Sequence, residues 1–242
     1  MGNSLKNKVA LVTGASSGIG LDTSIQLLEK GVRLFMVGRN MLDLKTRLSK
    51  FGFEEGQLVF IKADLVNDSD IMGIVKKIEV EGRLDILVHS AGVISLGPFE
   101  KVDIGNLDVQ YRINVRAPYL LTQKLLPTIT KSKGQIVFVN STAGLSSWEN
   151  NSQYSASKHA LRAIADSLRK EVASSGVKVM SVFPGATDTP MQKQVQQMEG
   201  NEYDPDIFLT ASEVASTIIT SISLPQNSMV TEITIRPNKY SK

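Results

Sequence analysis

Short runs of β-branched and apolar residues alternate with longer amphipathic stretches along almost the whole chain. The short runs are expected to be strands, at Lys8–Thr13, Arg33–Val37, Leu58–Lys62, Leu84–His89, Gln135–Asn140, Lys178–Phe183 and Val230–Ile235. The longer stretches are expected to be helices, at Ile19–Lys30, Met41–Lys50, Asp68–Glu81, Leu107–Thr130, Ser155–Ser175 and Ser212–Ile222. Most of the strand segments do not alternate apolar with polar residues, which indicates parallel strands covered on both faces. The pattern therefore predicts an α/β fold with a doubly wound parallel sheet, whose ligands bind beyond the carboxyl ends of the strands.

The composition is typical of one soluble globular domain, which we assign to residues 1–242. Hydrophobic residues make up 42% of the chain and charged residues 21%, both ordinary values. No repeat, low-complexity run or Pro/Gly/Ser-rich linker divides the sequence. The apolar run after the polar N-terminus ends at Val12, too early for a signal segment or a membrane span. We therefore expect a cytoplasmic protein that does not bind membranes.

Charge and residue counts exclude several kinds of site. The net charge is +3, but lysine and arginine are dispersed among acidic residues, and the short basic stretches lack interleaved aromatics. This distribution predicts no nucleic-acid partner. The absence of cysteine excludes disulfides, thiolate nucleophiles and cysteine-ligated metals. His89 and His159 lie far apart in the sequence without a matching acidic cluster, so no metal site is expected.

A glycine-rich turn follows the first expected strand and leads directly into a helical pattern. Its conspicuous residues are Gly14, Ser16, Ser17, Gly18, Ile19 and Gly20. Glycines let the chain turn tightly and bring backbone N–H groups against a pyrophosphate at the helix N-terminus. The spacing, G-x-x-x-G-x-G, differs from the G-x-G-x-x-G dinucleotide fingerprint. A strand–helix turn without a ligand is therefore the alternative.

A tyrosine and a lysine stand four residues apart at the start of another helical pattern, in Tyr154-Ser155-Ala156-Ser157-Lys158. This spacing places both side chains on one helix face. A free phenol has a pKa of about 10, and a nearby ammonium stabilises the phenolate and lowers that pKa. Together with the glycine turn, in this order and spacing, the motif resembles the short-chain dehydrogenase/reductase family. The resemblance extends from about Lys8 to Thr189.

The resemblance implies a single Rossmann domain with a seven-stranded parallel sheet in the order 3-2-1-4-5-6-7. It also implies an oxidoreductase that interconverts a carbonyl and an alcohol by hydride transfer. Tyr154 would be the general acid for reduction and the base for oxidation, and Lys158 would also hold the nicotinamide ribose. Ser141 would bond the substrate oxygen, and Asn114 would hold a water in a proton relay. Taken alone, each residue has an ordinary structural alternative, such as a surface pair, a strand-end cap or a buried amide.

The end of the second expected strand points to NADP(H) as the cofactor. An acidic residue there would accept hydrogen bonds from the adenosine ribose, whereas an arginine would donate hydrogen bonds to a 2′-phosphate. This chain has Gly38 followed by Arg39, and an exposed loop charge is the alternative for Arg39. The resemblance implies further cofactor contacts from Asp64, Leu65, Ser90, Ala91, Gly92, Pro184, Gly185, Thr187 and Thr189, besides Tyr154 and Lys158. His89-Ser90 stands where the family has two asparagines, and His89 is interpreted as a hydrogen-bonded residue at a strand end.

A small-molecule substrate is expected to contact the segments Val93–Glu100, Thr142–Asn151 and Met191–Leu209. Trp148 is the only tryptophan, and it either lines the pocket or packs against a loop. Residues 200–205 are typical of a lid loop. The chain has Arg236-Pro237 instead of an Asp-Gly-Gly tail, which favours carbonyl reductases and hydroxy-acid or amino-acid dehydrogenases over 3-oxoacyl carrier-protein reductases. The resemblance also implies a homo-oligomer, a dimer or tetramer.

Two other functions are compatible with the same motifs. A same-fold epimerase or dehydratase would hold the cofactor tightly, although such chains have a C-terminal lobe and another glycine spacing. A non-catalytic NADPH-sensing module would bind the cofactor without turnover, but the four catalytic residue types are all present here.

Overall fold

A computed structural model describes residues 5–40, 44, 48, 51–53 and 56–238 of the chain. Its main sheet has seven parallel strands in the order β3-β2-β1-β4-β5-β6-β9. The strands are β1 Val9–Thr13, β2 Arg33–Gly38, β3 Leu58–Lys62, β4 Ile86–His89, β5 Gln135–Val139, β6 Lys178–Pro184 and β9 Glu232–Ile235. A separate short pair joins β7 Thr187–Asp188 to β8 Leu209–Thr210. The expected strand order and the parallel, doubly wound fold are confirmed.

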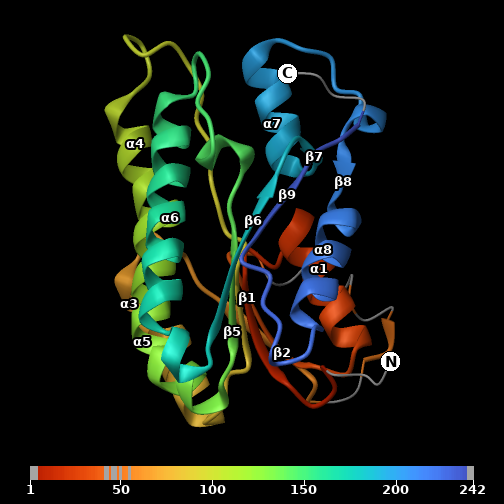
Figure 1. The fold of residues 1–242 in the computed structure, drawn as a ribbon. Helices are drawn as coiled ribbons and strands as arrows, with labels where there is room; N and C mark the ends of the chain where they lie inside the picture. The colour runs from red at the N-terminus through yellow and green to blue at the C-terminus, as the bar shows by residue number, and fades with distance from the viewer. Residues whose placement is uncertain (1–4, 41–43, 45–47, 49–50, 54–55, 239–242) are drawn as a thin grey trace.

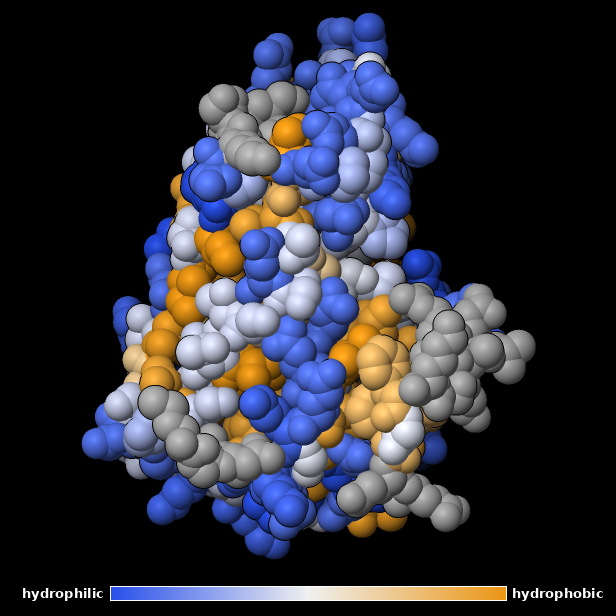
Figure 2. All heavy atoms as spheres, turned by 90° about the vertical axis from the view of Figure 1, so that its right-hand side faces the viewer, coloured by the Kyte–Doolittle hydropathy of each residue, from blue (hydrophilic) through white to orange (hydrophobic). Residues whose placement is uncertain are grey.

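Helices cover both faces of the sheet (Figure 1). They are α1 Gly18–Glu29, α3 Asp68–Glu81, α4 Ile104–Tyr111, α5 Ala117–Ser132, α6 Ser152–Glu171, α7 Pro190–Glu199 and α8 Ala211–Ile222. Helices α1 and α8 pack together on one face, and α3, α5 and α6 cover the other. On the α1 and α8 side, hydrophobic side chains reach the surface in separate patches between hydrophilic ones (Figure 2). Amphipathic helices bury an apolar stripe against the sheet and expose mostly polar residues, so only separate apolar patches remain at the surface.

The central strands are mostly apolar on both faces because each strand supplies two separate cores. In β1, Ala10 and Val12 belong to the core beneath α1 and α8. Val9 and Leu11 belong to the core on the opposite face. Successive side chains of a strand point to opposite faces, so both sets must be hydrophobic. The continuous apolar run of this strand follows directly from that geometry.

The long helix expected at Leu107–Thr130 is instead three segments. Helix α4 begins at Ile104, where the Asp103 carboxylate accepts a hydrogen bond from Gly105 N at 2.8 Å. A π-helix, Arg112–Arg116, then separates α4 from α5. Pro118 lies in the first turn of α5 and has no N–H to continue the α-helical ladder, which favours a wider turn there. The chain is helical throughout the expected segment, and the π-helix is its departure from regular α-helical geometry.

Other boundaries differ less, and one expected helix lies largely outside the described residues. Most of the segment Met41–Lys50 is not described, but Leu44 and Leu48 are helical and buried. Helix α3 has the expected bounds, α6 begins three residues earlier than expected, and the chain after α6 forms the 3₁₀ turn Ala173–Ser175. Helix α7 was not expected, because its sequence is glutamine-rich and has few apolar residues. Thr189 caps it by accepting a hydrogen bond from Gln192 N at 3.2 Å.

Asp85, at the amino end of β4, anchors two strands. Its side chain is only 4% exposed and accepts bonds from Val9 N at 2.9 Å, Lys8 Nζ at 3.0 Å and Arg83 Nε at 2.7 Å. Burial alone would raise the pKa of Asp85, but the hydrogen bonds from Val9 N, Arg83 and Lys8 together hold it below its ordinary value. The carboxylate is therefore a stabilising anion at neutral pH.

We expect Asp85→Asn to lower the free energy of unfolding by about 2–3 kcal/mol at pH 7, the usual range for buried bonds to a charged group. In the wild type this contribution is present above the unfolded-state pKa of about 3.9 and disappears as pH falls through the lower native pKa. Urea unfolding at pH 7 and at pH 3 measures both effects. Asp68→Asn is the control, because the Asp68–Arg116 pair is about half exposed and such pairs contribute little. Equal losses in the two variants would contradict this role of Asp85.

Candidate active site

A cleft of about 1000 Å³ opens along the carboxyl ends of the sheet strands. Most residues expected to bind a cofactor line it, namely Gly14, Ser16, Ser17, Gly18, Ile19, Arg39, Asp64, Leu65, Ser90, Ala91, Gly92, Pro184, Gly185, Thr187 and Thr189. Ser141, Tyr154 and Lys158 line the same cleft. Segments far apart in the sequence thus meet where a doubly wound sheet is expected to bind ligands.

The glycine turn after β1 lies in close contact with the turn after β4, and both turns line the cleft. Gly14 has φ +65°, and a Cβ there would lie 2.7 Å from backbone atoms of Ala91. Gly20 does not line the cleft, but a Cβ on it would lie 2.4 Å from Gly14 O. The N-cap residue of α1, Ser17, makes no side-chain capping bond. The backbone N–H groups of this first turn are therefore arranged as at an anion-binding helix terminus.

Thr13 holds the two turns together, a role that the sequence did not reveal. Its Oγ1 accepts hydrogen bonds from Ser90 N at 3.2 Å and Ala91 N at 3.3 Å. The same hydroxyl donates to Val88 O at 3.4 Å. A threonine directly before Gly14 was visible in the sequence, but a strand-end hydroxyl alone does not indicate which loop it will bond.

Tyr154, Lys158 and Ser141 converge at one end of the cleft. Tyr154 and Lys158 lie in the first turns of α6 and are only 6% and 3% exposed. The Lys158 ammonium lies 5.7 Å from the centroid of the Tyr154 ring and donates to Val139 O at 3.1 Å. Ser141 follows β5, and its side chain hydrogen-bonds Tyr154. The expected grouping of these three residues is present in the fold.

The electrostatics of the pair differ from the sequence expectation. Burial raises the pKa of Tyr154 to about 12, against a smaller lowering by the hydrogen bond with Ser141. Burial lowers the pKa of Lys158 to about 8. Desolvation disfavours the charged form of each group. The expectation that the ammonium lowers the phenol pKa is thus corrected: in this environment Tyr154 is a neutral phenol at pH 7.

Asn114 is buried behind the cleft, within the π-helix. Its Oδ1 accepts from Val93 N at 2.9 Å, and its Nδ2 donates to Val93 O at 2.9 Å and to Ser157 Oγ at 3.0 Å. Ser157 in turn donates to Tyr154 O at 2.7 Å. Asn114 therefore links the loop after β4 to the helix that carries Tyr154. Single-turn π segments are frequent at functional sites.

Asn140, at the end of β5, positions both Ser141 and Lys158. Its Oδ1 accepts from Ser141 N at 2.9 Å, and its Nδ2 donates to Lys158 O at 3.1 Å. The sequence predicts a strand at Asn140 and indicates no role for its side chain. Only the packing of α6 against the end of β5 reveals that this amide joins two site residues.

His89 is a core residue, as interpreted from the sequence. Its Nε2 lies 2.8 Å from Thr122 Oγ1, and its ring stacks on Phe138 with centroids 5.0 Å apart. Complete burial lowers the pKa of His89 to about 3. The imidazole is therefore neutral and has its hydrogen-bond partner away from the cleft.

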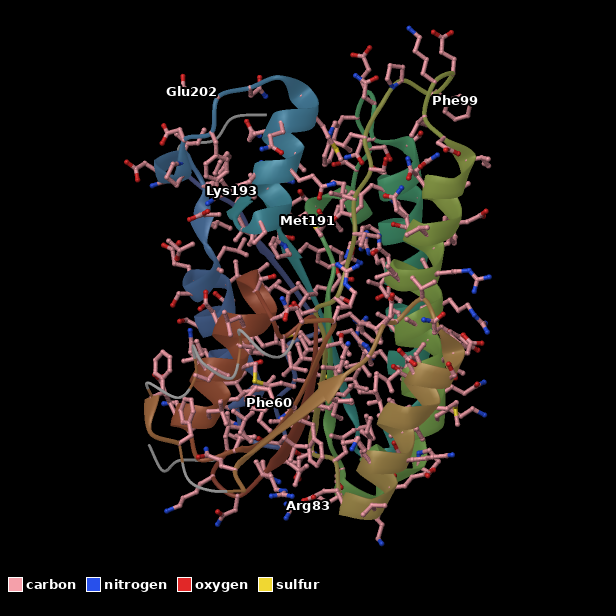
Figure 3. All side chains as sticks on the ribbon, turned by 180° about the vertical axis from the view of Figure 1, so that it is seen from behind. Phe60, Arg83, Phe99, Met191, Lys193 and Glu202 are labelled. Atoms are coloured by element: carbon pink, nitrogen blue, oxygen red, sulfur yellow. The ribbon has the colours of Figure 1, made fainter. Side chains whose placement is uncertain are left out.

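Parts of all three segments expected to contact a substrate line the cleft. Val93, Ile94 and Leu96 come from the first, Ser146 to Asn151 from the second, and Met191, Gln192, Gln194, Val195 and Glu199 from the third. Figure 3 shows Met191 on the side of α7 that faces the rest of the molecule. The loop at residues 200–205 does not line the cleft, so α7, rather than that loop, forms this wall.

Tyr203 links the segment after α7 to β7 through a hydrogen bond. Its hydroxyl donates to the Asp188 carboxylate, between Thr187 and Thr189. Lys193 Nζ lies 5.2 Å from the centroid of the Tyr203 ring.

Elsewhere, no metal-binding cluster and no helix able to cross a membrane occurs among the described residues.

Comparisons with known proteins agree with this geometry. Residues 8–200 match the family model described as short chain dehydrogenase. An uncharacterised oxidoreductase of Staphylococcus epidermidis is 34% identical over 236 residues, covering 96% of this chain and 98% of the relative. A variant of actinorhodin polyketide ketoreductase with NADPH superposes with a TM-score of 0.86 at 25% identity, over 96% of this chain and 97% of the other. ElxO with NADP bound has a similar fold, with a TM-score of 0.84 at 23% identity, over 96% and 98% of the two chains. The chain belongs to the short-chain dehydrogenase/reductase family and is an oxidoreductase of that family.

Proposed function

We propose that this protein is an NADP(H)-dependent oxidoreductase that interconverts a ketone or aldehyde and the corresponding alcohol. The observation that carries the proposal is the meeting of Tyr154, Ser141 and Lys158 in one cleft with the glycine turn and Arg39. Arg39 would hold the adenosine end of a dinucleotide along this cleft, and Tyr154 and Lys158 would lie at its nicotinamide end. The cleft thereby combines a phosphate-binding turn with a proton donor.

The residues of the cleft fit NADP(H). Gly14 and Gly20 leave no room for side chains where the backbone of β1 approaches the loop after β4, so the N-terminus of α1 is open to a pyrophosphate. Arg39 follows β2 and is exposed beside Gly38, a position that suits a 2′-phosphate. Asp64 and Leu65 would lie beside the adenine, and Thr187 and Thr189 near the nicotinamide amide. Two of the similar structures hold NADP or NADPH.

The reduction requires a proton for the oxygen of the substrate. When bound, the reduced nicotinamide supplies the hydride. Tyr154 donates its phenolic proton to the oxygen, because burial keeps this group protonated at neutral pH. Ser141 donates a hydrogen bond to the same oxygen and Lys158 compensates the charge that develops on Tyr154. The oxidation direction would require the phenolate of Tyr154, which burial disfavours at neutral pH.

Asn114 acts through its neighbours in this proposal. Its bonds to Val93 and Ser157 fix the loop after β4 against α6, and a water held near it would carry protons between Lys158 and solvent. A Cβ at Gly92 would lie 3.4 Å from Asn114 Oδ1 and 3.8 Å from Lys158 Nζ. The two groups therefore flank the same point of the backbone.

A binding titration followed by a turnover assay tests the function. Trp148 is the only tryptophan and lines the cleft, so bound NADPH should quench its emission by energy transfer. NADPH absorbance is then followed with a panel of ketones, aldehydes and alcohols. Quenching together with NADPH oxidation supports the proposal. Quenching without any turnover would instead identify a binding module, and release of tightly held nucleotide only on unfolding would identify an epimerase-like or dehydratase-like protein.

Arg39→Asp is expected to weaken NADPH binding by about 10–100-fold, because an arginine–phosphate bond contributes roughly 1.5–3 kcal/mol. The new carboxylate should also improve the relative use of NADH. The ratio of kcat/KM for the two cofactors measures this switch. Lys76→Glu on α3 is the control, since it reverses one exposed charge outside the cleft. An unchanged cofactor ratio in Arg39→Asp would refute the role of Arg39.

A further inference from the structure

The part of the cleft next to Tyr154 has three apolar walls. The side chains are Val93, Ile94 and Leu96 from the loop after β4, Trp148 from the loop after β5, and Met191 and Val195 from α7. Five of them are partly buried in the protein, and Trp148 is 49% exposed. An aromatic ring that is half exposed at the wall of a cleft retains apolar area that a ligand can cover.

The walls are held in place by bonds that are independent of any ligand. Gly97 N donates to Asn150 O at 2.9 Å, which joins the loop after β4 to the loop that carries Trp148. Val93 is fixed by both amide atoms of Asn114. From the third wall, Met191 Cε lies 3.7 Å from the position of a Cβ on Gly92. The apolar surface is therefore preformed around the catalytic end of the cleft.

The charges on these walls are negative. Glu149 and Glu199 line the cleft, whereas no lysine or arginine from the three wall segments does so among the described residues. Among the described residues, the basic side chains that line the cleft come from outside the three wall segments. Lys158 is beside Tyr154, Arg39 follows β2, and Arg236 follows β9, where its Cγ lies 3.6 Å from a Cβ position on Gly185. A substrate anion between the apolar walls would lose hydration without gaining a cationic partner from the wall segments themselves, because Lys158 lies at the Tyr154 end.

We infer that the substrate is a neutral, hydrophobic carbonyl compound or alcohol that carries a ring, with its ring against Trp148 and its oxygen at Tyr154. This inference rests on the proposed function and narrows it. It excludes hydroxy acids, amino acids and acyl thioesters of anionic carriers as the preferred substrates. Packing against Trp148 and the aliphatic walls provides the binding energy, and the acidic residues reject carboxylates.

A matched pair of ketones tests the charge preference without relying on turnover. Methyl 4-acetylbenzoate and 4-acetylbenzoate have the same ring and ketone, but only the second is an anion. Each is titrated into the complex with NADP⁺, and Trp148 emission reports binding directly at the proposed wall. We expect the ester to bind at least about tenfold more tightly, a modest effect for an uncompensated carboxylate. Equal or tighter binding of 4-acetylbenzoate would overturn the inference and point to Arg236 as a carboxylate partner.

Two variants separate the contact from the charge. Trp148→Ala should lower kcat/KM for methyl 4-acetylbenzoate by about 10–50-fold, the order expected on losing a buried aromatic contact, and should lower kcat/KM for butanone less, because butanone has no ring to cover the indole. Phe99→Ala is the matched control, because Phe99 is 86% exposed and does not line the cleft. Its side chain lies at the tip of the loop, away from Met191 (Figure 3). Glu149→Gln should improve binding of 4-acetylbenzoate alone.

The outcomes distinguish this inference from the proposed function. Binding of the ester without NADPH oxidation would support the apolar substrate pocket but contradict the proposed carbonyl reduction. Turnover of small or anionic carbonyl compounds in preference to the ester would retain the chemistry but defeat the substrate class. Equal effects of Trp148→Ala on methyl 4-acetylbenzoate and butanone would also count against a ring contact at Trp148.

Discussion

Tyr154→Phe is expected to lower kcat for ketone reduction by about 10³–10⁴-fold, at the upper end of what general acid catalysis contributes. The substitution removes the phenolic hydroxyl that Ser141 bonds but keeps the buried ring. Burial places the pKa of this phenol at about 12, so the wild-type acid is fully protonated from pH 6 to 9 and its supply does not limit reduction there. Single-turnover NADPH oxidation at pH 7 measures the loss.

Cofactor binding should be unaffected by the same substitution. Quenching of Trp148 by NADPH is expected to give affinities for wild type and Tyr154→Phe within about threefold of each other, because no charge changes. Tyr119→Phe is the matched control, since Tyr119 is exposed on α5 and outside the cleft. Retention of more than a tenth of wild-type kcat in Tyr154→Phe would show that another group provides the proton.

Gly14→Ala is expected to damage both the fold and the cofactor site. A Cβ at this residue would lie 2.7 Å from the backbone of Ala91, and the backbone has φ +65°. The left-handed conformation alone costs an L-residue roughly 1–2 kcal/mol, and the backbone contact prevents simple relief of the clash. We expect a loss of about 2–4 kcal/mol in the free energy of unfolding. NADPH affinity should also fall by about tenfold or more, because the phosphate-binding turn must shift.

Gly73→Ala provides a matched comparison in the same protein. Gly73 lies within α3, and a Cβ there meets nothing within 4 Å. Alanine in an open helix position should stabilise the protein by about 0.5–1 kcal/mol. Urea unfolding and Trp148 quenching measure both variants. If Gly14→Ala behaves like Gly73→Ala in both assays, the close approach between the two turns has no functional importance.

The architecture was predictable because its sequence signals are local and repeated. Each central strand is buried on both faces, so most of its residues are apolar, as in β1 and β6. The grouping of Tyr154 and Lys158 was predictable because the two residues share one helix and their spacing fixes their common face. Ser141 required the resemblance to a known family, because a serine after a strand carries no such geometric signal.

The features that escaped prediction depend on contacts between distant segments. The π-helix at Arg112–Arg116 interrupts an otherwise helical apolar pattern, and Pro118 was its only local sign. Asn140 and Thr13 act through bonds to loops that the fold brings near them. Helix α7 lies over the cleft with few buried residues, and its apolar stripe is limited to Met191, Val195 and Met198 among glutamines, a weak signal for a helix.

The phenol pKa could not be obtained from the motif either. Spacing shows that an ammonium lies near Tyr154, but the balance between its attraction and desolvation depends on burial, which only the packed structure reveals. Here burial dominates for both Tyr154 and Lys158. Tyr154 is therefore a neutral phenol at physiological pH.

We propose that NADPH bound in this cleft transfers a hydride to a carbonyl carbon while Tyr154 protonates the oxygen. The most direct measurement uses NADPH with deuterium at both C4 positions and a hydrophobic ketone in ordinary water, with the alcohol product examined by mass spectrometry and NMR. We predict one deuterium on the carbinol carbon of each alcohol and none at any other carbon. An alcohol without that deuterium, or NADPH that quenches Trp148 but is never oxidised by any ketone, would contradict the account.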